Sequence, residues 1–162
     1  MKHLKSIIFL FTFTIFAMTA MSQSIDGAIK SAKSDGKKVL IIFYSHSDSW
    51  SQKLEKEVLT YQAALAELNK FEVVKLDGDS EAKFDFKGKS VNAKELASMF
   101  SITGYPSFVF LNSDGSTISF KYNGESVTSL SGYLDAVDFV EMLKYFVANK
   151  QTDTDLSTMF GN

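Results

Sequence analysis

The chain has 162 residues, of which 45% are hydrophobic, so it is long enough for one domain with its own core. It contains no cysteine, which excludes disulfides and any reaction that needs a thiol. It also contains no arginine and has a net charge of −2, a composition that disfavours nucleic acid as a partner.

The first 22 residues predict a secretory signal peptide. Two lysines precede an apolar run from Ile7 to Met18, and small residues then suit cleavage before Gln23. The run is shorter than the roughly 20 residues of a membrane span, although an uncleaved anchor is the alternative. We therefore expect an exported protein that has no membrane association after cleavage.

Helices and strands alternate in the first half of the remaining chain. Apolar positions at helical spacing run from Ser24 until Gly36 stops them, and the apolar run at 37–45 predicts a strand buried on both faces. Residues 54–68 have the pattern of a long amphipathic helix broken near Thr60, and residues 71–77 predict a second strand.

The second half adds a hairpin and a closing helix. The expected elements are a polar loop with a short strand (78–92), a short helix (93–102), an antiparallel hairpin (107–124), a Ser/Thr-rich connection (125–132) and a last helix (135–148). Residues 23–149 then form one domain, and residues 150–162 are predicted to be a flexible tail. This order predicts an α/β fold with a mixed central β-sheet and helices on both faces.

Three stretches of this chain resemble the thioredoxin superfamily, in particular the exported thioredoxin-like proteins of bacterial envelopes. They are "AIKSAKSDGKKVLIIFYS" from residue 28, "SITGYPSFVFLNSDG" from residue 101 and "GYLDAVDFVEMLKYF" from residue 132. The resemblance implies a thioredoxin-like fold, a cis peptide bond before Pro106, the only proline, and a location in the periplasm, or otherwise outside the cell.

The resemblance also locates the position of the family's Cys-x-x-Cys motif, which this chain lacks. The four positions are Asp48, Ser49, Trp50 and Ser51. Neither aspartate nor serine can attack a disulfide usefully, so the resemblance implies a relative without thiol–disulfide activity. Asp48 is instead predicted to cap the following helix, and Lys75, which matches a lysine of the family, lacks its acidic partner because Ile42 stands at that position.

The retained surface predicts a protein- or peptide-binding role, such as a chaperone-like accessory. In the family, client peptides pair with the backbone near the cis-proline, and Trp50 and Tyr105 could provide aromatic area there. The alternative is that Trp50 packs on the next loop. The predicted binding residues are Asp48, Ser49, Trp50, Ser51, Tyr105 and Pro106.

Two other functions remain open, an enzyme of another class and a purely structural domain. A hydrolase-type or other small-molecule enzyme could use His46 and Asp48, but residues so close on one loop rarely form a catalytic set. They are also too few for a zinc site, and the acidic residues at 77–81 lack the spacing of a calcium loop. We therefore expect no catalytic residue, no metal and no cofactor.

Overall fold

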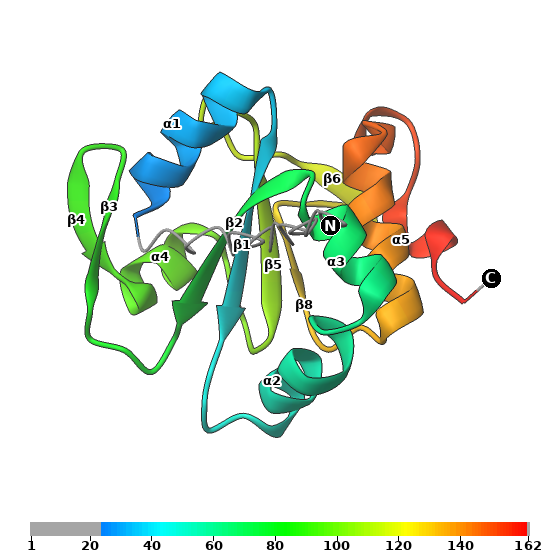
Figure 1. Cartoon of the computed structure of the whole chain (residues 1–162), viewed down its shortest axis with the longest axis horizontal. Helices are drawn as coiled ribbons and strands as arrows, with labels where there is room; N and C mark the ends of the chain where they lie inside the picture. Colours follow the sequence, from blue (N-terminus) through cyan, green and yellow to red (C-terminus); the bar gives the residue numbers. More distant parts are fainter. Residues whose placement is uncertain (1–23, 162) are drawn as a thin grey trace, which may run out of the picture.

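The computed structural model describes residues 24–161, so the predicted signal peptide at 1–22 lies outside the described residues. The core is a four-stranded sheet in the order β2-β1-β5-β8 (Figure 1). Its strands are β1 (Lys38–Tyr44), β2 (Phe71–Asp77), β5 (Ser107–Leu111) and β8 (Ser129–Ser131). β1 is parallel to β2 and antiparallel to β5, which confirms the predicted mixed sheet.

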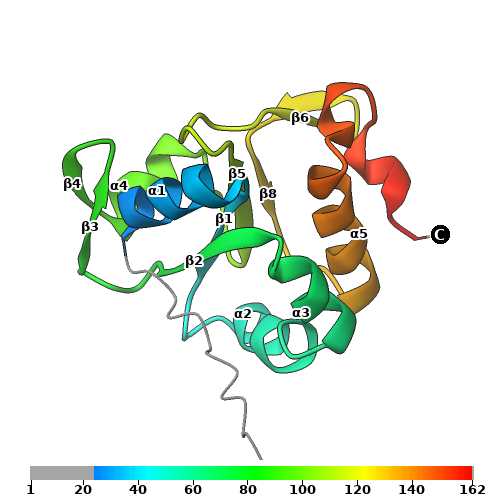
Figure 2. The same cartoon turned by 45° about the horizontal axis from the view of Figure 1, so that its top comes forward.

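Helices cover both faces of this sheet, as Figures 1 and 2 show. One face packs against α1 (Ile25–Asp35), α4 (Ala93–Met99) and the hairpin of β3 (Lys83–Phe86) and β4 (Lys89–Asn92). The other face packs against the π-helical turn η1 (Leu54–Val58), α3 (Gln62–Leu68) and α5 (Ala136–Val147), and the short helix α2 (Ser49–Lys53) leads directly into η1. Alternate residues of β1 serve the two faces, since Leu40 and Ile42 lie in one core cluster and Ile41 and Phe43 in the other.

Polar side chains begin the helices where the sequence indicates. The Ser24 hydroxyl caps α1 and the Asp135 carboxylate caps α5, each by accepting backbone N–H groups of the first turn. Asn92 and Glu95 form a reciprocal capping box at α4. The helix predicted over 54–68 is interrupted at 59–61, close to Thr60 as expected, and so becomes η1 and α3.

The hairpin predicted at 107–124 forms around its turn but is shorter than expected. β5 pairs with the following segment only next to the turn, through the Leu111–Thr117 bridge and a hydrogen bond from the Ile118 N–H to the Phe110 carbonyl, and its partner strands are β1 and β8. β6 (Phe120–Tyr122) pairs instead with β7 (Glu125–Val127). The Ser/Thr-rich connection expected at 125–132 therefore contains two strands.

The segment after α5 is folded onto the domain, in contrast to the expected flexible tail. Short 3₁₀ turns, η2 (Lys150–Thr152) and η3 (Leu156–Met159), follow the helix, and Leu156 is fully buried in the core. The Tyr145 hydroxyl donates a hydrogen bond of 2.7 Å to the Thr154 carbonyl. The physical reason is that Leu156, the partly buried Met159 and Phe160, and the hydrogen bond of Tyr145 fix the tail to the core.

Within residues 24–161, no helix has both the length and the apolar content needed to cross a bilayer.

Candidate functional site

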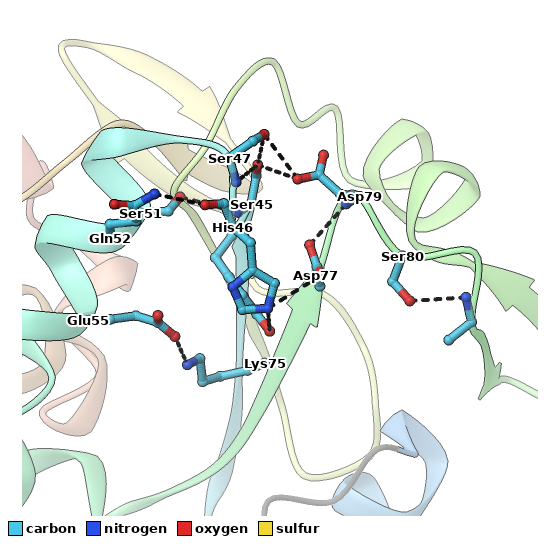
Figure 3. Close-up of polar contacts among 12 residues, drawn as sticks. Ser45, His46, Ser47, Ser51, Gln52, Glu55, Lys75, Asp77, Asp79 and Ser80 are labelled. Atoms are coloured by element: carbon cyan, nitrogen blue, oxygen red, sulfur yellow. Dashed lines mark hydrogen bonds and ion pairs between the residues drawn. The ribbon is translucent and has the colours of Figure 1, made fainter.

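The loop between β1 and α2 is held by a network of two serines and one aspartate. The Ser45 hydroxyl donates to Asp79 Oδ2 at 2.6 Å and lies 2.9 Å from the Ser47 hydroxyl, which donates to the same carboxylate oxygen at 3.1 Å (Figure 3). The Ser45 hydrogen bond is the main cause that lowers the pKa of Asp79 from its ordinary value, with smaller contributions from Ser47 and from nearby His46. We call Ser45, Ser47 and Asp79 the serine–aspartate network. It connects the β1–α2 loop to the end of β2.

The two positions that correspond to the family's cysteines have structural roles. Asp48 is the N-cap of α2, as predicted, and its carboxylate accepts the Ser51 N–H at 2.6 Å. A cap of this kind contributes about 1 kcal/mol. Ser51 is buried, and its hydroxyl accepts the Ser45 N–H at 3.2 Å. Both side chains therefore fix the backbone of this loop.

Trp50 is 52% exposed at the start of α2, yet one side of its ring is covered. Its ring lies 5.2 Å from that of Tyr133, measured between centroids. The Lys53 ammonium lies 4.8 Å from the Tyr133 ring centroid and 5.5 Å from that of Trp50, which suits cation–π attraction. Trp50 thus packs on the segment after β8, as the alternative from the sequence expected, and about half of its surface stays exposed.

The Tyr105–Pro106 turn lies beside the end of β2. The peptide bond between Tyr105 and Pro106 is cis, Pro106 is buried, and its carbonyl accepts the Gly132 N–H at 2.8 Å. The Tyr105 ring covers Gly78 so closely that a Cβ atom there would lie 2.1 Å from the tyrosine hydroxyl. Burial, together with the charges of Asp79 and Asp77, raises the pKa of the Tyr105 hydroxyl.

The predicted binding residues are therefore only partly brought together. Trp50 contacts Tyr133, whereas Tyr105 is directed to Gly78, and no ring contact joins Trp50 to Tyr105 in the described part of the chain. Ser49 is exposed beside Trp50. Tyr133 and Lys53 were missed by the sequence reasoning. The one sequence signal for Tyr133 as a site residue is its place in "GYLDA", at the start of the third stretch that resembles the family.

The structure does not assemble a catalytic set at His46. Its Nε2 atom lies 3.5 Å from the Tyr44 hydroxyl and 3.7 Å from Asp77 Oδ2, and its side chain is 68% exposed (Figure 3). Neither Asp48 nor a serine hydroxyl contacts the His46 ring among residues 24–161. In that same range no group of three or more metal-ligating side chains could hold an ion.

Lys75 has a partner that the sequence reasoning missed. Its ammonium forms an ion pair with the carboxylate of Glu55 (Figure 3). Glu55 lies in η1, the turn that directly follows α2. Ile42 lies opposite Lys75 in the parallel register, which confirms that the acid of the family is absent from β1. The positive charge of Lys75 is thus paired with a carboxylate of η1 and not with an acid of the neighbouring strand β1.

The comparisons agree with this geometry. A thioredoxin-fold protein from Helicobacter pylori is 20% identical, with a TM-score of 0.60 and coverage of 76% of this chain and 80% of the other. A thioredoxin from Thermus thermophilus is 22% identical, with a TM-score of 0.55 and coverage of 78% and 85%. A putative disulphide-isomerase from Bacteroides thetaiotaomicron is 23% identical, with a TM-score of 0.53 and coverage of 76% and 88%.

At these identities the similarity establishes the fold alone. A comparison with curated proteins found no match. Residues 25–147 match the thioredoxin-like domain family, which covers most of the chain. The mixed sheet, the helix that begins at Asp48 and the turn at Pro106 all lie inside the matched range. The chain therefore belongs to the thioredoxin-like domain family.

Proposed function

We propose that this chain is an exported, periplasmic thioredoxin-fold protein that has no thiol–disulfide activity and binds a protein or peptide. The absence of cysteine supports the first part, because disulfide exchange needs a thiolate. The proposed binding surface, which we call the tryptophan face, consists of Trp50, Tyr133, Lys53 and the Tyr105–Pro106 turn.

The observation that carries the binding role is the half-exposed Trp50 ring on its Tyr133 and Lys53 support. An aromatic ring that is already ordered loses little conformational freedom on binding and offers a large apolar area to a partner. The serine–aspartate network and the Asp48 cap hold the helix that carries this ring. The tryptophan face is thus preorganised by side chains that take the place of the dithiol.

We expect photo-crosslinking to detect the partner. A photoreactive amino acid at Ser49, which is exposed beside Trp50, should give adducts in the native cell envelope. Trp50→Ala should reduce the adducts at least tenfold, since aromatic hot spots are worth about 2 kcal/mol or more. One dominant adduct indicates a dedicated partner, and many unfolded proteins indicate a chaperone-like role.

The matched control is Met99→Ala, which removes another large exposed side chain, on α4 across the sheet. It should leave the adducts unchanged. The proposal fails if no adduct forms, or if Trp50→Ala and Met99→Ala behave alike.

A further inference from the structure

The outer edge of β8 is an open edge of the central sheet. β8 is three residues long, pairs with β5 on one side and has no strand on its other side within the sheet. Ser107 lies opposite Ser131 and Phe108 opposite Leu130. In an antiparallel pair, only alternate residues exchange backbone hydrogen bonds with the partner strand.

The hydrogen bond next to β8 shows which residues of β8 bond to β5. The Gly132 N–H donates to the Pro106 carbonyl at 2.8 Å, so Leu130 is the next residue of β8 that bonds to β5. Ser129 and Ser131 therefore direct their backbone N–H and C=O groups away from β5. These four groups are arranged as another strand requires them.

A shallow hollow of about 540 Å³ runs along this edge. Besides the β8 serines, residues with hydroxyl side chains from the segment after α4, from β7 and from the β7–β8 connection line it, namely Ser101, Thr103, Ser126 and Thr128. Glu125 is the only charged residue among its lining residues. The hollow thus gives room for an extended chain beside β8.

The two edges of the sheet differ in their protection against pairing. Proteins commonly guard edge strands with charged side chains or proline. β2, at the opposite edge, carries Glu72, Lys75 and Asp77. β8 has the sequence Ser-Leu-Ser, without a charge or a proline, and its short length of three residues is its only protection of this kind.

We propose that an extended segment of a partner polypeptide, carrying a lysine or arginine, adds to β8 as a fifth strand. Its backbone pairs with Ser129 and Ser131, and its cation faces Glu125. Glu125 is exposed and forms no ion pair within the described residues 24–161. A second copy of this chain is disfavoured, because removal of Lys2 and Lys5 with the signal peptide makes the net charge −4.

This surface adjoins the tryptophan face but uses different residues, so each proposal can fail alone. The probe is a capped ten-residue peptide of alternating threonine and valine with one central lysine. Amide hydrogen exchange, followed by NMR on the chain without its signal peptide, reports each residue separately. Saturating peptide should slow exchange of the Ser129 and Ser131 amides at least about tenfold, since new hydrogen bonds protect them.

Two substitutions at one position separate backbone pairing from side-chain contact. Ser129→Pro removes the outward N–H and should abolish the protection at Ser131, whereas Ser129→Ala keeps the backbone and should retain it. Glu125→Gln, or a peptide with glutamate in place of lysine, should weaken binding severalfold. If Ser129→Pro does not fold, the exchange measurement on the unsubstituted chain still decides the proposal.

Three results would overturn this inference. The first is unchanged exchange at both serine amides. The second is peptide binding that Trp50→Ala abolishes and Ser129→Pro retains, which would assign the peptide to the tryptophan face. The third is protection that depends on protein concentration without peptide, together with a dimer mass by light scattering, which would make a second copy the occupant.

Discussion

At the scale of single residues, the loop before α2 depends on one carboxylate. Asp79 accepts from both serines of the serine–aspartate network. Its pKa is lowered in the folded chain, mainly by the Ser45 hydrogen bond, so the unfolded chain binds a proton more readily at this position. The network therefore stabilises the fold at neutral pH, and this contribution is lost as the pH falls through the lowered pKa.

The lowered pKa of Asp79 predicts that the natural chain and Asp79→Asn differ in stability by an amount that depends on pH. The urea midpoint of the variant should be lower at neutral pH, because the charged acceptor of two hydroxyls is lost. The difference should shrink as the pH drops below 3.8, the ordinary pKa of the group.

Asp85→Asn is the control for this measurement, since Asp85 is exposed on β3 and takes part in no hydrogen bond or ion pair with any described residue. It should show no such pH dependence. A difference for Asp79→Asn that stays constant with pH would contradict the role given to its charge.

At the scale of helices and strands, local sequence patterns predict an element correctly where the contacts that form it are between residues close in sequence. The apolar run at 38–44 and the capping residues at 24, 92 and 135 specify their elements without knowledge of the rest of the chain. At β5 the turn signal "SDG" correctly predicts a hairpin with the next segment, but it does not reveal that the hairpin is short or that β5 also pairs with β8. β8 is only three residues long, and short strands carry almost no periodic signal.

The C-terminal segment shows the same limit. A polar tail with one leucine has the composition of a frayed end, and the sequence does not reveal that α5 leaves a site for that leucine. In the structure Leu156 is fully buried, and Asp155 accepts the Gly124 N–H at 2.7 Å. The tail thus ties α5 to the β6–β7 hairpin.

We expect Leu156→Ala to lower the free energy of unfolding by about 2–5 kcal/mol, the range for large-to-small substitutions in a core. Leu65→Ala is the matched control, because Leu65 is 42% exposed on α3. It should cost less than about 1 kcal/mol. Urea denaturation followed by circular dichroism measures both, and equal small losses would show that the tail adds nothing to the core.

At the scale of the whole molecule, the chain keeps the architecture of its family and has changed the chemistry of one helix start. The fold and the position of the changed motif could be predicted because they depend on element order and on one local match. The contacts that replace the dithiol could not. Asp79, Glu55 and Tyr133 are each distant in sequence from the side chains they contact, and no periodic pattern links them.

Because the architecture is kept, two substitutions should restore thiol chemistry. Asp48→Cys with Ser51→Cys places two thiols at the start of α2, where the helix N-terminus lowers the pKa of the first one. We expect an intramolecular disulfide in oxidised glutathione, detected by mass spectrometry, and slow catalysis of insulin reduction when dithiothreitol is supplied as the reductant. The single variant Asp48→Cys should form only mixed disulfides. Two cysteines that stay reduced would show that the helix start has departed from the family's geometry.

The Asp48 cap and the serine–aspartate network have a consequence for the surroundings in which the chain can work. A dithiol changes its covalent state with the thiol balance of its compartment, and the shape and charge of the loop change with it. Here the same loop is fixed by carboxylates and hydroxyls, which do not respond to that balance. The shape of the surface around Trp50 therefore does not change with the thiol balance, and a partner of the kind proposed would receive no thiol-redox signal from it.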